Sequence, residues 1–519
     1  MSRRIAVSRS TNGGGRDVAR LLSDFGHDLP AIPAAADPIK DPRLFPRGVS
    51  RRGRAAAGRG WAAANAPVAS YRMTSDQAPV FWPFITAPGL PPTGAVMGID
   101  QHSGGAFYAD PLGWVLRDDI AVTNPNIFCF GKPGGGKSGT TKAFCNRMLD
   151  YGYRVLILGD TKNEYEELCQ SYGVDPFAIG VGLGTRINPI AFGPLGHGWE
   201  NLSAAEAQRR AAIVFRRWQT LVGGLVGSMR VGDRRVPYGP TEARVVLAGL
   251  EYLTGYASDQ STLVETTIQQ LWHLLDNPTD DLVNQCRYAN KQQFFDETRL
   301  LRDALGQLVT GPLAGLFDDH TTIDVDWTAP IQSLNLARLR ELGEEPVGIA
   351  LLCLNSWGRG MREIAAPSDG RGDLRIVVRD ESWLQLRLGV EAVKSFDADL
   401  RLSRGAAGQG GDIQFAVAHK PSDLLSAGDA GSQAATIAKD LIDLADIKIL
   451  HGQDRKVGEE LDTMLGLGPK AQKLVTGWAR QAKGRALWRI GETTYKVATV
   501  LHPDEKRMFY TNSAIDAAA

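Results

Sequence analysis

The sequence predicts an α/β fold with a mostly parallel central sheet, an inserted helical subdomain and a C-terminal β-hairpin. Three observations lead to this prediction. Short apolar runs alternate with helix-like runs on both sides of the middle of the chain, which is typical of βαβ units. The middle itself has few strand-like runs. Near the C-terminus, two strand-like runs flank one short segment that begins with glycine.

The first βαβ unit begins with an apolar strand at residues 126–130, which leads directly into a glycine-rich loop. Residues 138–151 are expected to form a helix, and residues 154–158 a second strand that ends at Asp160. Because the whole unit fits within about 35 residues, the two strands should be parallel and lie in a sheet with both faces covered.

Residues 200–310 are expected to form the inserted helical subdomain. Two segments, residues 203–206 and 262–265, fit the capping-box pattern of a helix start, and an amphipathic run follows each of them.

The α/β pattern then resumes, so residues 74–199 and 311–519 are predicted to be two parts of one core. The elements expected in the second part are strands at 331–336, 374–378, 413–418 and 446–450, a helix at 347–357, and hairpin strands at 485–490 and 495–500.

Composition and charge restrict the class of protein. The 519 residues are enough for roughly two to four structural units. Lysine plus arginine equal aspartate plus glutamate at 58 each, which argues against a protein that coats nucleic acid with its whole surface. A local basic groove remains compatible with this balance.

The cysteines and apolar runs indicate a cytoplasmic protein. The five cysteines are scattered without metal-ligand spacing, which is typical of reduced, buried thiols. The longest apolar runs, such as residues 349–354, are much shorter than the ~18 residues that a membrane span needs. Residues 1–30 contain no apolar block of the kind found in a secretory signal. Such a chain could still dock onto a membrane complex.

The N-terminal arm, residues 1–73, differs from the rest of the chain. Residues 1–60 contain eleven arginines and one lysine against five aspartates, a net charge of +7, and are poor in aromatic and branched residues. We therefore expect a basic, largely disordered arm. It is either a solubilising tail or an arm that contacts nucleic acid or anionic lipid.

The glycine-rich loop after the first strand matches G-x-x-x-x-G-K-S/T without a mismatch. Glycines let the main chain curl around a phosphate chain, and the following helix directs its positive N-terminus at the same anion. Lys137 would reach the β- and γ-phosphates, and the Ser138 hydroxyl would ligate Mg²⁺. The residues expected to bind ATP are Gly131, Lys132, Pro133, Gly134, Gly135, Gly136, Lys137, Ser138 and Gly139.

A second acidic element follows the apolar strand at residues 374–378. Asp380 would orient the Mg²⁺ shell and Glu381 would act as general base toward water, since ligands of parallel sheets bind at the carboxyl edge of the strands. The alternative is that both acids only cap the next helix. Arg379 is unusual, because a central strand favours an apolar residue at that position.

Three further residues are catalytic candidates. His419 follows the strand at residues 413–418, where it could sense the γ-phosphate or serve only as a structural hydrogen-bonding residue. Arg401 and Arg404 lie between the two strands and are candidates for an arginine finger lent to a neighbouring subunit, or are ordinary surface arginines.

Basic pairs also occur in the helical insert, at residues 209–210 and 216–217. Acidic residues are interleaved with them, so a solvated helix face and a nucleic-acid contact both remain open.

Taken in order, these motifs resemble the conjugative and type IV secretion ATPases of the VirB-four/TraC/TrbE kind, within the wider HerA/FtsK group. The resemblance extends from about residue 74 to residue 511. The segments that carry it are residues 83–84, 98–100, 160–165, 188–189, 311–318 and, most specifically, 380–383.

The sequence departs from the family pattern at three places. Ala418-His419 stands where the family has threonine-glutamine, and Ser382 replaces an alanine. The family's N-terminal domain would be reduced to fewer than about 90 residues.

The resemblance implies a RecA-like motor that assembles as a homo-hexamer with ATP and Mg²⁺ bound between subunits. It would energise DNA or protein export, or channel or pilus assembly, from the inner face of the cell membrane. The implied partners are type IV secretion channel subunits, with a coupling protein and a relaxase as further candidates. An alternative is a HerA- or coupling-protein-like ATPase that translocates DNA. A third hypothesis is a nucleotide-binding scaffold without significant turnover. The presence of both Lys137 and Glu381 argues against it.

Overall fold

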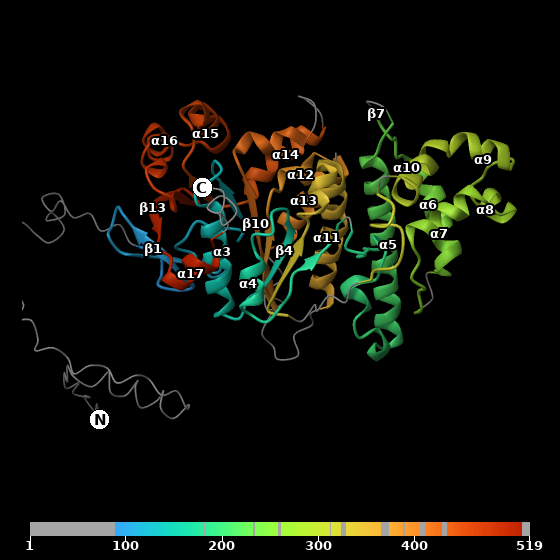
Figure 1. Cartoon of the computed structure of the whole chain (residues 1–519), viewed down its shortest axis with the longest axis horizontal. Helices are drawn as coiled ribbons and strands as arrows, with labels where there is room; N and C mark the ends of the chain where they lie inside the picture. Colours follow the sequence, from blue (N-terminus) through green and yellow to red (C-terminus); the bar gives the residue numbers. More distant parts are fainter. Residues whose placement is uncertain are drawn as a thin grey trace, which may run out of the picture. The chain divides into compact units, whose positions relative to one another are not determined.

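The computed structural model describes residues 89–510, except for 181, 232–233, 258–260, 312, 323–328, 365–372, 388–389, 404–409 and 428–432. The N-terminal arm predicted at residues 1–73 lies outside the described residues. The predicted α/β class is confirmed, because one large sheet is flanked by helices (Figure 1).

The sheet has eleven strands in the order β2-β1-β13-β12-β11-β3-β10-β9-β4-β8-β5. The seven strands from β11 to β5 are parallel, and the other four are antiparallel. The strands are β1 (Ala95–Asp100), β2 (Ala106–Ala109), β3 (Ile127–Phe130), β4 (Arg154–Asp160), β5 (Phe177–Ala178), β8 (Ile331–Asn335), β9 (Asp373–Arg379), β10 (Gly410–Ala418), β11 (Ile447–His451), β12 (Arg485–Ile490) and β13 (Thr493–Thr499).

The helices of the core cover both faces of this sheet. They are α2 (Pro111–Val115), α3 (Lys137–Leu149), α4 (Glu166–Gln170), α11 (Glu344–Ile364), α12 (Trp383–Leu386), α13 (Val390–Leu402), α14 (Gln433–Asp443), α15 (Gly458–Leu465), α16 (Pro469–Thr476) and α17 (Pro503–Met508).

Side chains of β3 alternate between the two faces of the sheet, and both faces are buried. Ile127 and Cys129 pack with Phe144 of α3, whereas Phe128 and Phe130 pack on the opposite face with the side chains of α13 and α14. Successive side chains of a strand point to opposite faces, so a strand that is buried on both sides must be apolar throughout.

The predicted C-terminal hairpin is confirmed as β12 and β13, which pair antiparallel around Gly491. Strands β1 and β2 were not predicted from the sequence, and they extend the sheet beyond this hairpin through the pairing of β1 with β13. The four antiparallel strands therefore form one edge of the described sheet.

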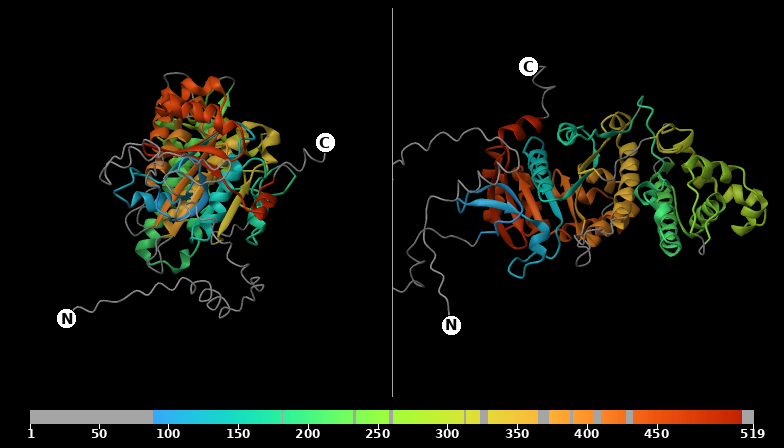
Figure 2. Two further views of the ribbon diagram at one scale, coloured as in Figure 1. Left: turned by 90° about the vertical axis from the view of Figure 1, so that its left-hand side faces the viewer. Right: turned by 90° about the horizontal axis from the view of Figure 1, so that it is seen from below.

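The segment between the two parts of the core is helical apart from a small ribbon of β6 (Arg230–Val231) and β7 (Arg234–Arg235). Figure 2 places these helices beyond α11, on the side of the sheet away from β1. They are α5 (Ala204–Ser228), α6 (Pro240–Thr254), α7 (Ile268–Asp276), α8 (Asp280–Gln285), α9 (Lys291–Glu297) and α10 (Arg299–Val309).

One of the two predicted helix starts is confirmed and the other is wrong. Ser203 and Glu206 form a capping box at the start of α5. The box expected at residues 262–265 does not form, because α7 begins at Ile268 and is capped by Thr267.

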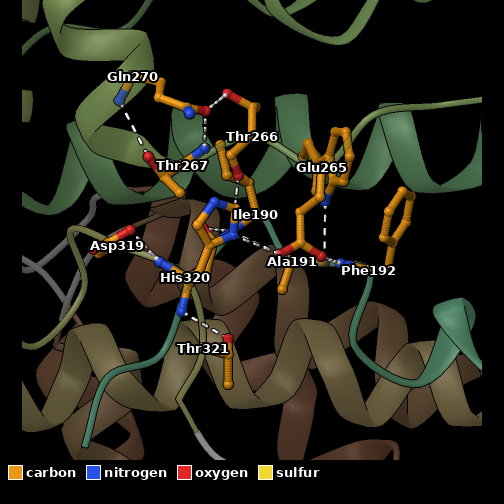
Figure 3. Close-up of polar contacts among 12 residues, drawn as sticks. Ile190, Ala191, Phe192, Glu265, Thr266, Thr267, Gln270, Asp319, His320 and Thr321 are labelled. Atoms are coloured by element: carbon orange, nitrogen blue, oxygen red, sulfur yellow. Dashed lines mark hydrogen bonds and ion pairs between the residues drawn. The ribbon is translucent and has the colours of Figure 1, made fainter. Parts of the chain in front are cut away.

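Glu265 instead joins the insert to the core. Its carboxylate accepts a hydrogen bond from the Phe192 backbone N–H at 2.9 Å and lies 3.3 Å from both Asn188 Nδ2 and His320 Nδ1 (Figure 3). Glu265 therefore makes tertiary contacts with residues distant in sequence instead of the local helix cap that its spacing favoured.

All five cysteines are buried and free of disulfides. No helix within the described residues is long and apolar enough to cross a membrane.

Candidate nucleotide site

The glycine-rich loop lies at the carboxyl edge of the parallel strands, between β3 and α3. Three neighbours hold its backbone: Gly131 N–H donates to the His419 carbonyl at 3.0 Å, Lys132 N–H donates to that of Gly452 at 3.3 Å, and Gly484 N–H donates to that of Gly135 at 3.3 Å. Strands β10, β11 and β12 thus all contribute to the shape of the loop.

Close packing requires glycine at two positions in the loop. A Cβ at Gly131 would lie 2.6 Å from the Cβ of His451, and a Cβ at Gly136 would lie 2.5 Å from the Gly484 nitrogen. Gly136 also has a φ of +104°, a conformation that L side chains rarely adopt. The close approach of β11 and β12 therefore depends on the absence of side chains here.

Helix α3 begins at Lys137 without a side-chain cap, so its first backbone N–H groups are available to an anion. The Lys137 ammonium donates to the Gly131 carbonyl at 2.5 Å and lies 3.4 Å from His419 Nδ1. Burial lowers the pKa of Lys137, while Cys129, Glu381 and Asp380 oppose that shift. A phosphate chain in the loop would supply the negative charge that this buried ammonium needs.

The two acids after β9 lie in the same place. Asp380 and Glu381 are both buried, and Glu381 has a φ of +50°, so the chain turns sharply directly after the strand. Residues in such conformations often occur at functional sites. Ser382 N–H then donates to the Val417 carbonyl of β10 at 3.2 Å, which ties the turn to the neighbouring strand.

The two carboxylates have different electrostatic environments. Burial and the nearby charges of Glu381 and Glu164 raise the pKa of Asp380 to about 7. Burial would also raise the pKa of Glu381, but the hydrogen bond and charge of Lys162 outweigh it, so the pKa of Glu381 lies below its ordinary value. Glu381 is therefore ionised at neutral pH and able to accept a proton.

His419 reaches both halves of the site. Its Nε2 lies 3.4 Å from Glu381 Oε2, and its Nδ1 faces Lys137 as described above. The end of β10 places this side chain between the P-loop lysine and the acid, because β10 lies between β3 and β9 in the sheet.

Lys162 is a site residue that was not among those predicted from the sequence. Its ammonium lies 2.8 Å from Glu381 Oε1. Asp160 shapes the turn that projects it, since the buried Asp160 carboxylate accepts hydrogen bonds from the backbone N–H groups of Lys162, Glu164 and Tyr165. Two features of the sequence pointed toward this lysine: it follows the end of a predicted strand by two residues, and it lies within the segment 160–165 that carries the family resemblance.

The unusual arginine before the two acids has a structural explanation. Arg379 points to the opposite face of the sheet from α3, where its guanidinium lies 2.7 Å from Asp399 Oδ2 of α13 and 3.1 Å from Gln414 Oε1 of β10. Arg359 of α11 also contacts Asp399, at 2.5 Å. A buried arginine is thus compensated by a buried carboxylate.

The two arginine-finger candidates are not part of this cluster. Arg401 is exposed near the C-terminal end of α13, where it pairs with Asp397 at 2.8 Å. Helix α13 leads back toward the start of β10, so its C-terminal end lies at the opposite edge of the sheet from the P-loop. Arg404 lies outside the described residues.

The fold is that of a RecA-like P-loop NTPase. A solved structure of VirB4 from Thermoanaerobacter pseudethanolicus is similar, with a TM-score of 0.60 and 19% identity over 81% of this chain and 100% of that chain. The bacterial conjugative coupling protein TrwB, as its ΔN70 form, has a TM-score of 0.49 and 12% identity over 79% of this chain and 89% of that chain. The sequence matches no family model and no curated protein. The likeness to VirB4 confirms the fold that the sequence motifs implied.

Proposed function

We propose that this chain is an ATPase that energises a type IV secretion or conjugative transfer system. The observation that carries the proposal is the convergence of Lys137, Glu381 and His419 at the carboxyl edge of the sheet. A P-loop lysine and an ionised glutamate within one site are the groups that nucleotide hydrolysis requires. The shared fold with VirB4, which covers that chain completely, supports the secretion setting.

The residues of the chain would divide the chemistry as follows. The loop glycines and the N-terminus of α3 would bind the phosphates, and Lys137 would leave the Gly131 carbonyl to stabilise charge on the transferred group. Glu381 would accept the proton of the attacking water. His419, between the two, would report whether the γ-phosphate is present.

The site also fits Mg²⁺. Ser138 at the start of α3 and the buried Asp380 offer the oxygen donors that this cation prefers. When bound, Mg²⁺ would neutralise charge on the β- and γ-phosphates. The raised pKa of Asp380 fits a carboxylate that is placed to face a cation.

The quaternary and cellular setting is part of the same proposal. We expect a homo-hexamer with ATP at subunit interfaces, attached peripherally to the inner face of the cell membrane. Type IV secretion channel subunits would be its partners, joined by a coupling protein and a relaxase where the substrate is DNA. The exposed position of Arg401, away from its own P-loop, is compatible with a role at a neighbouring subunit's site.

The first test combines enzymology with partner capture. Glu381→Gln should bind ATP normally but release phosphate at least ~100-fold more slowly than the parent protein, as loss of a general base predicts. Glu345→Gln, an exposed change on α11, is the matched control and should retain activity. Near-normal turnover in Glu381→Gln would remove that residue from the mechanism.

The ATP-trapped Glu381→Gln protein then serves as bait in gently solubilised native cells, with mass spectrometry as the readout. Recovery of envelope channel proteins, a relaxase or a coupling protein would support the secretion role. Recovery of nucleases and recombination factors without a membrane partner would instead favour a DNA-processing translocase.

A further inference from the structure

A pocket of about 320 Å³ lies between helix α5 of the insert and helices α11 and α13 of the core. Its described lining includes three arginines, Arg216, Arg217 and Arg359, and no acidic residue. The pocket shares no lining residue with the nucleotide site, and nothing in the ATPase mechanism uses it.

The walls combine apolar and cationic surface. Ile213, Leu221 and Leu352 supply aliphatic side chains, while the arginines supply the charge. This combination matches the chemistry of protein interaction hot spots, where an apolar anchor enters a pocket and arginine pairs with a carboxylate.

The arginines differ in how firmly they are held. Arg217 donates to the Ser356 hydroxyl at 3.1 Å, and Arg359 donates to the Ser395 hydroxyl at 2.8 Å and contacts Asp399. The Arg216 side chain is exposed, and no described side chain pairs with it. Two arginines are thus preorganised on the wall, and the third is available to an incoming anion.

We propose that this arginine pocket is a docking site for an acidic peptide segment of a partner protein, in which a carboxylate accompanies an apolar side chain. A phosphodiester backbone fits it less well, because nucleic acids bind along open, polar grooves rather than in a compact pocket with aliphatic walls. The net positive lining supplies the charge complementarity.

The pocket is connected through ion pairs to β9, the strand that Asp380 and Glu381 follow. Arg359 on its wall contacts Asp399, which contacts Arg379, and Arg379 directly precedes Asp380. A carboxylate that binds Arg359 would compete with Asp399 for the same guanidinium. Because Asp399 also pairs with Arg379, the last residue of β9, this competition would alter the ion pair that holds the end of the strand. Occupation of the pocket should therefore change the rate of ATP turnover, an expectation that rests on the proposed ATPase function.

The test uses the full-length protein and a random copolymer of glutamate and tyrosine as the probe for acidic and apolar peptide. Polyglutamate tests charge alone, and a 30-nucleotide oligo-dT tests nucleic acid. Binding is measured by fluorescence anisotropy of the labelled polymers, and turnover by phosphate release. We expect the copolymer to bind at least tenfold more tightly than polyglutamate and to change kcat at least twofold.

The variant pair is Arg216→Glu and its matched control Arg209→Glu, an exposed arginine two turns earlier on α5 and outside the pocket. Arg216→Glu should weaken copolymer binding at least tenfold and abolish the change in turnover, whereas Arg209→Glu should retain both. If Arg216→Glu lowers the melting temperature, Arg216→Gln provides the same comparison without a charge reversal.

Three outcomes would overturn the proposal: no copolymer binding to the parent protein, equal effects of both glutamate variants, or competition by oligo-dT that Arg216→Glu removes. Copolymer binding without a change in kcat would overturn the connection to β9. A protein that binds the copolymer but never hydrolyses ATP would refute the proposed function and leave the docking site supported.

Discussion

The Lys162 ammonium lies 2.8 Å from Glu381 Oε1, so the turn after β4 and the turn after β9 are joined by an ion pair inside the candidate site. Glu381 Oε2 accepts a further hydrogen bond from the Trp383 indole at 2.6 Å. The proposed base is therefore held on both oxygens before any substrate arrives. Lys162 also keeps Glu381 ionised beside the buried Asp380.

This relationship leads to the first prediction. Lys162→Met should lower kcat roughly 10- to 100-fold. Without the Lys162 ammonium, burial would raise the pKa of Glu381, and a protonated Glu381 cannot accept a proton from water. Lys162→Arg should recover part of the activity. Phosphate release under saturating ATP is the measurement, and Lys291→Met, which removes an exposed ion pair with Asp280, is the control. Unchanged kcat in Lys162→Met would show that the ion pair has no part in turnover.

The second prediction concerns the P-loop lysine. Lys137→Ala should abolish measurable turnover and weaken ATP binding, since the buried ammonium is the nearest cation to the expected phosphate position. Equilibrium binding of a fluorescent ATP analogue separates the two effects. Lys473→Ala, at an exposed position on α16, is the control and should retain its turnover.

The third prediction addresses the buried ion pairs behind β9. Asp399→Asn should lower the free energy of unfolding by about 3–5 kcal/mol, because Arg359 and Arg379 would lose their shared carboxylate. Asp303→Asn breaks an exposed pair with Arg299 and should cost less than about 1 kcal/mol. Urea unfolding of both variants measures the difference. Equal losses of unfolding free energy in the two variants would contradict the assignment of the Asp399 ion pairs as buried and that of Asp303 as exposed.

The fourth prediction uses a buried lysine outside the nucleotide site. Burial lowers the pKa of Lys448 on β11 to about 8, although its ammonium donates to the Ala445 carbonyl at 2.7 Å. The unfolded chain binds this proton up to the ordinary pKa of about 10.4, so it holds more protons than the folded protein between pH 8 and that value. Stability of the parent protein should therefore rise with pH across this window.

Lys448→Met isolates that contribution. The variant should be more stable than the parent protein at pH 7 by up to about 2–3 kcal/mol, and the difference should disappear above pH 10.5. Urea unfolding at one-unit pH intervals measures it. Lys470→Met, at an exposed position, should change stability by less than about 0.5 kcal/mol, and a Lys448→Met difference independent of pH would contradict the shifted pKa.

The fifth prediction tests whether a finger is lent between subunits. Arg401→Ala and Arg404→Ala should each be mixed with Lys137→Ala in equal amounts. If one arginine acts in trans, about a quarter of the mixed sites combine an intact lysine with an intact finger and recover activity. Lys137→Ala mixed with Glu381→Gln is the control and should recover nothing, because both groups belong to one subunit's site. Failure of both arginine mixtures would count against a shared site.

Local sequence determined much of the fold. The apolar strands of the core, the P-loop and the start of α3 could all be predicted. An apolar strand followed by a glycine-rich loop and a helix is a pattern compatible with few other local structures. Gly136 illustrates the point, since a left-handed conformation beside Gly484 is accessible only to glycine. Asp380 and Glu381 could be placed at the carboxyl edge because they directly follow an apolar strand of the predicted parallel sheet.

Tertiary structure alone decided the remainder. The spacing of residues 262–265 favoured a helix cap, but Glu265 contacts Phe192 and His320, which are distant in sequence. Lys162 entered the site because β4 lies beside β9, an order that no local pattern specifies. Arg379 is compatible with a buried strand only because α13 brings Asp399 to it. In each case the free energy of a buried polar group depends on which partner the fold supplies, and that partner is known only once the chain is folded.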